Sequence, residues 1–389
     1  MEFTSPEPKL LLCAARQFVS SEPAEGFPEL LRHVTDWPRL FELASRHGVS
    51  PLVAQLLHQF DRPLPEFCAT QLQAESRERA RQSLYLTAEL LKVLDLFETH
   101  SIPALAFKGP VLAASLYGNI ALRESVDLDI LIRREDVPRA KEAMLAQGYR
   151  TDLPTDSAPE TAYLRARYEL HFTTENGLLI EIHQAFLAPY CCFSLDDEAL
   201  WRRLERKSFC GREILALTPE DLLLALSAHA TKHRWSRLAW ICDVARLLVV
   251  SNEEIDWPLL TSRASSLGAG RMLRLGVFLA GHLLGAPVPA EIMQSAEQDQ
   301  SLVRLAGSVV KSLFREDTAA GDLGDHLFFL NARERFRDKL VYCTRLAFTP
   351  TEEDHSALSL PSLLSPLYCP LHAFRVMGKY GLTSLKSLL

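Results

Sequence analysis

Residues 105–132, LAFKGPVLAASLYGNIALRESVDLDILI, place two carboxylates, Asp127 and Asp129, in an otherwise apolar run. Residues two apart in a β-strand point to the same side, so the two aspartates are expected to face outward together. The apolar residues that alternate with them are expected to face the core: Val126, Leu128 and Ile130. Neighbouring like charges repel each other, and a divalent magnesium ion, which takes hard oxygen ligands, would relieve that repulsion. The pair therefore predicts a metal and phosphate site.

An ordinary amphipathic strand with a solvated acidic face would show the same D-x-D pattern, but the residues before it favour the site. Residues 104–107 indicate a short buried strand, Lys108-Gly109 a tight turn, and residues 110–117 a helix with proline at its first position. The first amides of a helix lack partners, and the helix dipole is positive there. The turn therefore predicts an anion site opposite the aspartates.

Arg123 and Ser125 lie just before the acidic strand. A guanidinium can hold phosphate oxygens with paired N–H groups, and a hydroxyl can donate a hydrogen bond to one. Both residues are therefore candidate phosphate contacts.

A third carboxylate is expected on a neighbouring strand, because two metal ions that share a triphosphate need more ligands than two aspartates provide. The dipeptide at 176–177, Asn-Gly, suits a type I′ turn and predicts a hairpin of two strands, residues 167–174 and 178–184. Alternation in the second strand puts Glu181 and His183 on one face. Glu181 is the candidate third acidic residue, with a solvated strand residue as the alternative, and His183 is interpreted as a neighbour and not as a ligand.

These motifs together resemble a known family. KGPVLAASLY, then R-x-S-x-D-x-D-I-L-I, then I-E-I-H, are similar to the DNA polymerase β-type nucleotidyltransferase superfamily, in particular its poorly characterised bacterial branch with a K-G turn. The resemblance extends over residues 77–188. Many relatives carry Gly-Ser at the turn where this chain has Lys108-Gly109-Pro110, so Lys108 would replace the phosphate contact of that serine.

The resemblance implies a reaction in which an NMP moves from a nucleoside triphosphate such as ATP to an acceptor hydroxyl, and pyrophosphate leaves. Two Mg²⁺ ions are the implied cofactors and the triphosphate is the co-substrate. The implied metal ligands and catalytic residues are Asp127, Asp129 and Glu181. The implied nucleotide-phosphate contacts are Lys108, Gly109, Arg123 and Ser125.

The acceptor is not identified by the sequence, and three hypotheses remain open. A small molecule, a peptide or a protein is favoured as acceptor. RNA, with tRNA as one example, is the second hypothesis, for which clustered basic residues would be the footprint: Lys232, Arg234 and Arg237. The third is a nucleotide-binding module that keeps the fold without turnover.

Residues 227–244, SAHATKHRWSRLAWICDV, resemble the helical region that follows the catalytic core in the same bacterial branch. Lys232 or His229 could reach the triphosphate or the acceptor from there, and Lys232 is included among the nucleotide-binding residues; a plain contact between helices is the alternative. His229 and His233 share a helical face, but without a matched third ligand no zinc site is assigned. Asp243 is expected to be buried and paired with a basic residue, for which the helix that carries His229 and Lys232 is the candidate source.

The expected fold class is α+β: a small mixed nucleotidyltransferase sheet with flanking helices, plus N-terminal and C-terminal helical regions. A long helix over residues 76–100 is expected to pack on the sheet, and a possible short strand lies at residues 212–217. The C-terminal tail, residues 350–389, is expected to pack on the helical domain. Contact of this tail with a membrane surface or a partner is the alternative. The predicted divisions are a helical region (1–76), the catalytic core (77–190), a helical domain (191–349) and a Pro/Leu-rich tail packed on that domain (350–389).

Composition agrees with this class without selecting it. The 389 residues include 42 basic and 49 acidic side chains, a net charge of −7 that argues against broad nucleic-acid binding. The eight cysteines form no C-x-x-C pair and are expected to be reduced. Neither a leader peptide nor an apolar run of roughly 20 residues is evident, so a cytoplasmic protein without a membrane span is expected.

Overall fold

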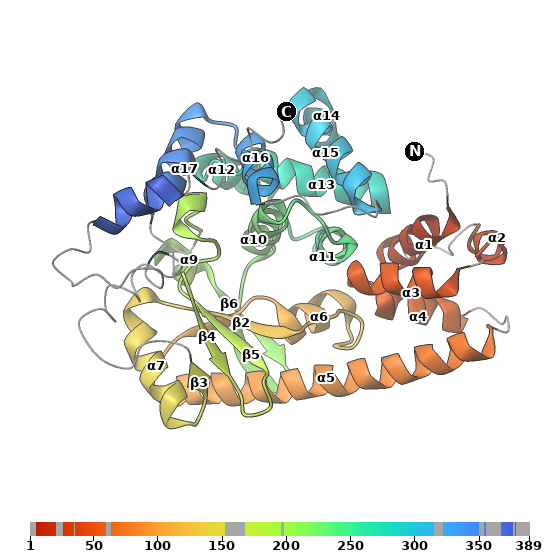
Figure 1. Cartoon of the computed structure of the whole chain (residues 1–389), viewed down its shortest axis with the longest axis horizontal. Helices are drawn as coiled ribbons and strands as arrows, with labels where there is room; N and C mark the ends of the chain where they lie inside the picture. Colours follow the sequence, from red (N-terminus) through yellow and green to blue (C-terminus); the bar gives the residue numbers. More distant parts are fainter. Residues whose placement is uncertain are drawn as a thin grey trace.

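The structure is a computed structural model (Figure 1). It describes residues 5–20, 26–34, 36–59, 64–151, 168–195, 198–314, 322–349, 354, 367–375 and 378. Most of the predicted tail at 350–389 therefore lies outside the described residues. Within its described part, the ring of His372 bonds the carbonyl oxygen of Leu346 at 3.0 Å, which ties residues 367–375 to the preceding helix.

Seven strands of the described chain form one mixed sheet in the order β3-β4-β5-β2-β1-β7-β6. The pairs β2–β5 and β1–β7 are parallel, and the other neighbours are antiparallel. Together with the surrounding helices, this mixed sheet confirms the predicted α+β class. The strands are β1 (Ala104–Ala106), β2 (Asp127–Ile132), β3 (Arg150–Thr151), β4 (Glu169–Thr173), β5 (Leu179–His183), β6 (Glu205–Phe209) and β7 (Arg212–Ala216).

The possible strand at residues 212–217 is confirmed as β7, and the sequence analysis missed its hairpin partner β6. Both strands come from the range predicted as a helical domain, yet they extend the same sheet beside β1. The division of the chain into domains stays a prediction.

Helices surround the sheet. The N-terminal ones are α1 (Pro6–Ser20), α2 (Phe27–Arg32), α3 (Trp37–Arg46), α4 (Ser50–Gln59) and α5 (Glu66–Thr99). Those between the strands are α6 (Gly109–Tyr117), η1 (Arg134–Asp136), α7 (Val137–Ala146), η2 (Pro189–Cys191) and α9 (Glu198–Arg203). The C-terminal ones are α10 (Pro219–Lys232), α11 (Leu238–Val250), α12 (Trp257–Ser266), α13 (Gly270–Leu284), α14 (Ala290–Gln298), α15 (Gln300–Leu313), α16 (Asp322–Ala332) and α17 (Phe336–Phe348). No helix among the described residues combines the length and apolar character that crossing a membrane requires.

The long helix α5 begins at Glu66, so the predicted start at residue 76 is wrong. Its first turns bury Cys68 and Leu72 in the core shared with the N-terminal helices, whereas Leu86 to Phe97 pack under the sheet. In Figure 1, α5 runs along the bottom of the molecule from the N-terminal helices to the sheet. One helix thus joins two cores, and packing on the first core extends it beyond the expected start.

The two faces of the sheet differ in chemistry. Leu128, Ile130 and the matching residues of β4 and β5 are buried in a core with α5 and α7. The other face carries the acidic residues, and α10 and α11 lie on that side (Figure 1). The prediction for Val126 is wrong: it precedes β2 and is 67% exposed, because the strand begins only at Asp127. The apolar alternation therefore starts at Leu128.

The predicted hairpin is present, but its turn differs from the expected type I′. Such a turn needs positive φ at two residues, whereas only Gly177 of the Asn-Gly pair has one, at 79°. The amide of Gly177 donates to the carbonyl oxygen of Thr174 at 3.0 Å, and the amide of Thr174 donates to that of Leu178 at 3.0 Å. A three-residue loop closed by a left-handed glycine therefore joins β4 to β5.

His47 joins the N-terminal helices to α11. Its ring accepts a hydrogen bond from the amide of Leu238 at Nδ1, 3.4 Å away, and packs on Phe314 with ring centroids 5.1 Å apart. Burial, with a smaller contribution from the nearby Arg46 charge, lowers the pKa of His47 to about 4. Because the folded state then binds fewer protons than the unfolded state, His47 should lower stability as the pH falls from about 6.5 to 4.

A pKa difference of that size corresponds to at most about 3 kcal/mol. We expect His47→Asn, whose side-chain oxygen can still accept the Leu238 amide, to flatten the decline of unfolding free energy between pH 6.5 and 4. Urea unfolding of the wild type and of His47→Asn at several pH values measures this pH dependence of the unfolding free energy. The exposed His33 gives the control variant His33→Asn. An equally steep decline in His47→Asn would contradict the prediction.

Candidate active site

Strand register brings the polar residues together. Parallel pairing of β2 with β5 sets Asp129 opposite Glu181, and antiparallel pairing of β4 with β5 sets His171 opposite Glu181 and Glu169 opposite His183. Residues directly opposite each other share a face of the sheet. Three adjacent strands therefore supply one cluster of carboxylates and imidazoles.

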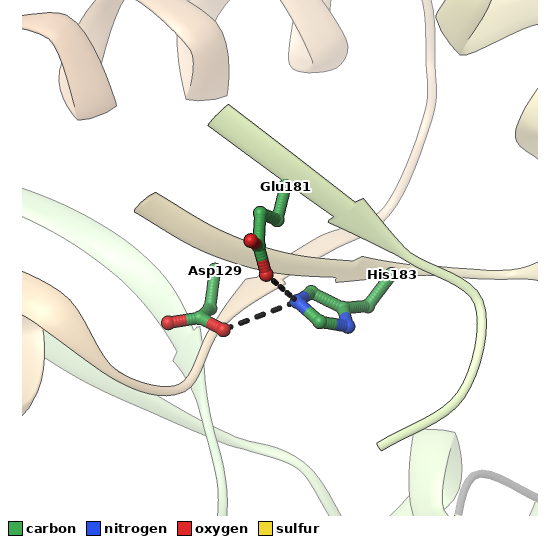
Figure 2. Close-up of side chains that lie close together, drawn as sticks. All are labelled: Asp129, Glu181 and His183. Carbon is green, nitrogen blue, oxygen red and sulfur yellow. Dashed lines mark hydrogen bonds and ion pairs between the residues drawn. The ribbon is translucent and has the colours of Figure 1, made fainter. Parts of the chain in front are cut away.

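His183 lies at the centre of this cluster (Figure 2). Its Nε2 is 3.1 Å from Asp129 Oδ1 and 3.3 Å from Glu181 Oε2, and its Nδ1 is 3.6 Å from Glu169 Oε2. Burial alone would lower the pKa of His183, but hydrogen bonds to Asp129 and Glu181 raise it to about 9. The imidazolium therefore donates to two carboxylates that would otherwise repel each other.

Lys108 supplies a second positive charge. It is the N-cap residue of α6, and its Nζ donates to Asp129 Oδ1 at 3.1 Å. The predicted turn is present: Gly109 has a φ of +63°, and a Cβ there would lie 3.6 Å from the backbone oxygen of Asp127. The left-handed backbone suits glycine, whereas a Cβ at this position would make only ordinary van der Waals contact. The turn thus places the ammonium of Lys108 among the carboxylates.

The two aspartates have different environments. Asp129 is only 7% exposed, and although burial alone would raise its pKa, the Lys108 charge and the His183 hydrogen bond hold that pKa well below its usual range. Burial, followed by the charges of Asp129 and Glu181, raises the pKa of Asp127 to about 6. Asp127 thus carries the uncompensated part of the repulsion. A divalent cation bound nearby would lower the pKa of Asp127 again, because such a cation stabilises the ionised carboxylate.

Two overlapping sets of donor atoms could hold a metal ion in the described part of the chain, and they share Glu181. Asp129, Glu181 and His183 form one set, and Glu169, His171 and Glu181 form the other, with all donor atoms of a set within 4.8 Å of one another. Carboxylate oxygens suit Mg²⁺, and imidazole suits transition metals. The residues present therefore fit a divalent cation.

Arg123 and Ser125 also lie together, and Arg123 Nη1 donates to Ser125 Oγ at 3.1 Å. Arg123 Nε lies 3.0 and 3.1 Å from the two carboxylate oxygens of Asp243, and Tyr117 Oη donates to the same carboxylate at 2.9 Å. Asp243 is 1% exposed, so the expectation of a buried aspartate paired with a base is confirmed. The base is Arg123, from the segment before the acidic strand.

Helix α10 faces the cluster. Lys232 Nζ donates to Tyr168 Oη at 3.1 Å and lies 5.2 Å from the centre of that ring. His229 and His233 contact each other, with ring centroids 4.9 Å apart, and both contact Trp240. Burial, then the charge of Lys108, lowers the pKa of His229.

Glu169 and His171 had no predicted role, and His183 was predicted only as a neighbour of the site. The signal was present, because E-L-H at 169–171 and E-I-H at 181–183 show the same alternation as the aspartates. What the sequence could not show was the strand register that sets Glu169 opposite His183 and His171 opposite Glu181.

A mixed sheet with facing carboxylates on a parallel strand pair, covered by helices, defines an α+β protein of nucleotidyltransferase type. Residues 33–285 match the model of a family described as uncharacterised nucleotidyltransferase, and the chain belongs to that family. The match includes the whole sheet and the helices from α3 to α13. Neither the curated proteins nor the solved structures contain a match to the chain.

Proposed function

We propose that this chain transfers an NMP from a nucleoside triphosphate to an acceptor hydroxyl in a metal-dependent reaction, as a member of the DNA polymerase β-type superfamily. The pairing of Asp129 with Glu181 on adjacent parallel strands, with Asp127 two residues away, carries the proposal. Family membership supports the same reaction class.

Asp127, Asp129 and Glu181 are the proposed ligands of magnesium, with two ions in the complete site. A bound ion would neutralise phosphate charge and lower the pKa of the attacking hydroxyl. The chain's own residues position the reactants: Lys108, at the first turn of α6, can move from Asp129 to a phosphate oxygen. Asp243 holds the guanidinium of Arg123, which is a second proposed nucleotide contact. The remaining proposed nucleotide contacts are Gly109, Ser125 and Lys232.

In the proposed step, the acceptor oxygen forms a bond to the α-phosphorus, and the bond from that phosphorus to the bridging oxygen breaks. Pyrophosphate leaves with the electron pair of the broken bond. The acceptor proton passes to a carboxylate, for which Glu181 is our candidate. His183, whose pKa is raised to about 9 by its hydrogen bonds to Asp129 and Glu181, holds both carboxylates in place and is not the proposed base.

A small molecule, a peptide or a protein is the proposed acceptor class. RNA is the less favoured class, because the chain carries a net charge of −7. Arg234, one of the three clustered basic residues, also lies 3.4 Å from Asp325. Label transfer into RNA that falls steeply with salt would favour RNA instead.

The test incubates the purified protein, magnesium and each of four α-phosphate-labelled nucleoside triphosphates with small-molecule, RNA and protein fractions of a bacterial lysate. The matched control is Asp127→Asn. Label that enters one fraction only with the intact protein would support the function and identify the acceptor class. If no label enters any fraction and no nucleotide binds, the proposal is wrong.

Removing divalent cations with EDTA is expected to abolish labelling, because the clustered carboxylates then cannot approach a triphosphate without repulsion. Adding back Mg²⁺ or Mn²⁺ in excess should restore it. The measurement is the rate of label transfer before chelation, after it and after add-back. Undiminished transfer in EDTA would rule out a metal-dependent mechanism.

A further inference from the structure

A cavity of about 280 Å³ lies between α10, α16, α17 and η2, on the helical side of the cluster. Figure 1 shows α16 and α17 on the far side of α10 from the sheet. The lining of the cavity combines aromatic and charged side chains from four segments that are distant in sequence: Tyr190, Lys232, Asp325, His326, Phe329 and Tyr342.

The aromatic rings form a connected set. Tyr190 meets Tyr342 edge to face with centroids 5.9 Å apart, and Phe329 stacks on Tyr342 at 5.2 Å. His326 Nδ1 and the hydroxyl of Tyr342 share a hydrogen bond of 2.7 Å, which fixes both rings. Aromatic walls held in fixed orientations suit a planar ring, which gains by stacking and edge contacts.

The cavity borders the catalytic cluster through Lys232, which lines it. Lys232 Nζ bonds Tyr168 Oη, and the Tyr168 ring lies 6.3 Å from the His183 ring. The residue after Tyr168 is Glu169, whose carboxylate is 3.6 Å from His183 Nδ1. A molecule seated in the cavity would therefore be connected to the carboxylates through the side chains of Lys232, Tyr168 and His183.

Size argues for a ring and against a whole nucleotide. Sites for drug-sized ligands span roughly 300–1,000 Å³, so this cavity holds about one ring system. We propose that it binds a planar aromatic or heteroaromatic ring of the acceptor, whose hydroxyl then extends past Lys232 towards Asp129. The assignment rests on the proposed function, since only transfer makes the occupant an acceptor.

The binding test uses phenol and 5-hydroxyindole as probes and saturation-transfer NMR on the whole protein. His326→Trp fills the cavity and Tyr190→Leu removes one wall, so each is expected to weaken probe binding at least about tenfold. The control Phe336→Leu changes an aromatic residue of α17 that is 79% exposed and lies outside the lining. Thermal unfolding of every variant reports folding.

ATP with magnesium should not displace the probes. In the lysate assay, 5-hydroxyindole should reduce labelling, and a tenfold higher nucleotide concentration should not relieve the inhibition. Equal probe binding by the wild type and both folded variants would overturn the proposal. Displacement by ATP would overturn it too, because the cavity would then hold the nucleobase. If the cavity variants weaken probe binding but no labelling occurs in the lysate assay, the result would count against the transfer reaction and not against the ring site.

Discussion

Asp129→Asn is expected to reduce nucleotidyl transfer by roughly 1,000-fold or more while the protein stays folded. The asparagine oxygen can still accept hydrogen bonds from Lys108 and His183, which both lie 3.1 Å from Asp129 Oδ1. What it loses is the negative charge on which cation binding depends. Asp127→Asn should lower transfer similarly but cost less stability, because in the described part of the chain Asp129 makes a close ion pair with Lys108 and Asp127 makes none.

The measurement combines the initial rate of label transfer with circular dichroism and thermal unfolding of each variant. Asp136→Asn is a matched control, since Asp136 is also buried, at 6% exposure, but lies in η1 and pairs with Arg139. The control should retain transfer. Undiminished transfer in both Asp127→Asn and Asp129→Asn would refute the assignment of this cluster as the catalytic site.

The second large effect is expected at the ion pair between Arg123 and Asp243. Their side chains are 11% and 1% exposed, so removing one partner leaves a charge in a poorly solvated place. We expect Asp243→Ala to lower the free energy of unfolding by about 3–5 kcal/mol. Tyr117 would also lose its acceptor. Urea unfolding measures the change.

Arg123→Met combined with Asp243→Leu should recover most of that loss, because apolar groups of similar volume often replace a buried ion pair without cost. The exposed pair of Glu29 with Arg32 provides the control, and Glu29→Ala should change stability by no more than about 1 kcal/mol. A loss in Asp243→Ala no larger than in Glu29→Ala would show that the pair does not stabilise the fold.

Local patterns predicted a large part of the fold. The strands β1, β2 and β5, the K-G turn and the helix α6 all follow from alternation, proline position and turn residues within a few positions of each other. Glu181 was selected for the site because it lies on a strand that follows the acidic strand, and because the family resemblance implies a third carboxylate there. Where the pattern was weak, prediction failed. Helix α5 begins ten residues before its predicted start at residue 76, and strand β6, whose polar residues are exposed, was not predicted.

The pairings that build the site lie beyond local reach. His183 and Asp129 are 54 residues apart, and Arg123 and Asp243 are 120 apart. No periodicity within either segment encodes such a contact, because strand order and helix packing depend on the total apolar area that all elements bury together. The aromatic side chains that line the cavity beside α10 likewise come from separate helices: Tyr190 from η2, Phe329 from α16 and Tyr342 from α17.

The sequence by itself determined that two aspartates share one face of a strand behind a helix-initiating turn, since a strand repeats every two residues. Only the tertiary structure decided which groups meet those aspartates. Parallel pairing of β2 with β5 brought Glu181 to Asp129, and the packing of the chain placed Lys108 Nζ and His183 Nε2 each 3.1 Å from the Asp129 carboxylate. Local backbone geometry fixes the direction of a side chain, whereas its neighbours are set by the packing of the whole chain.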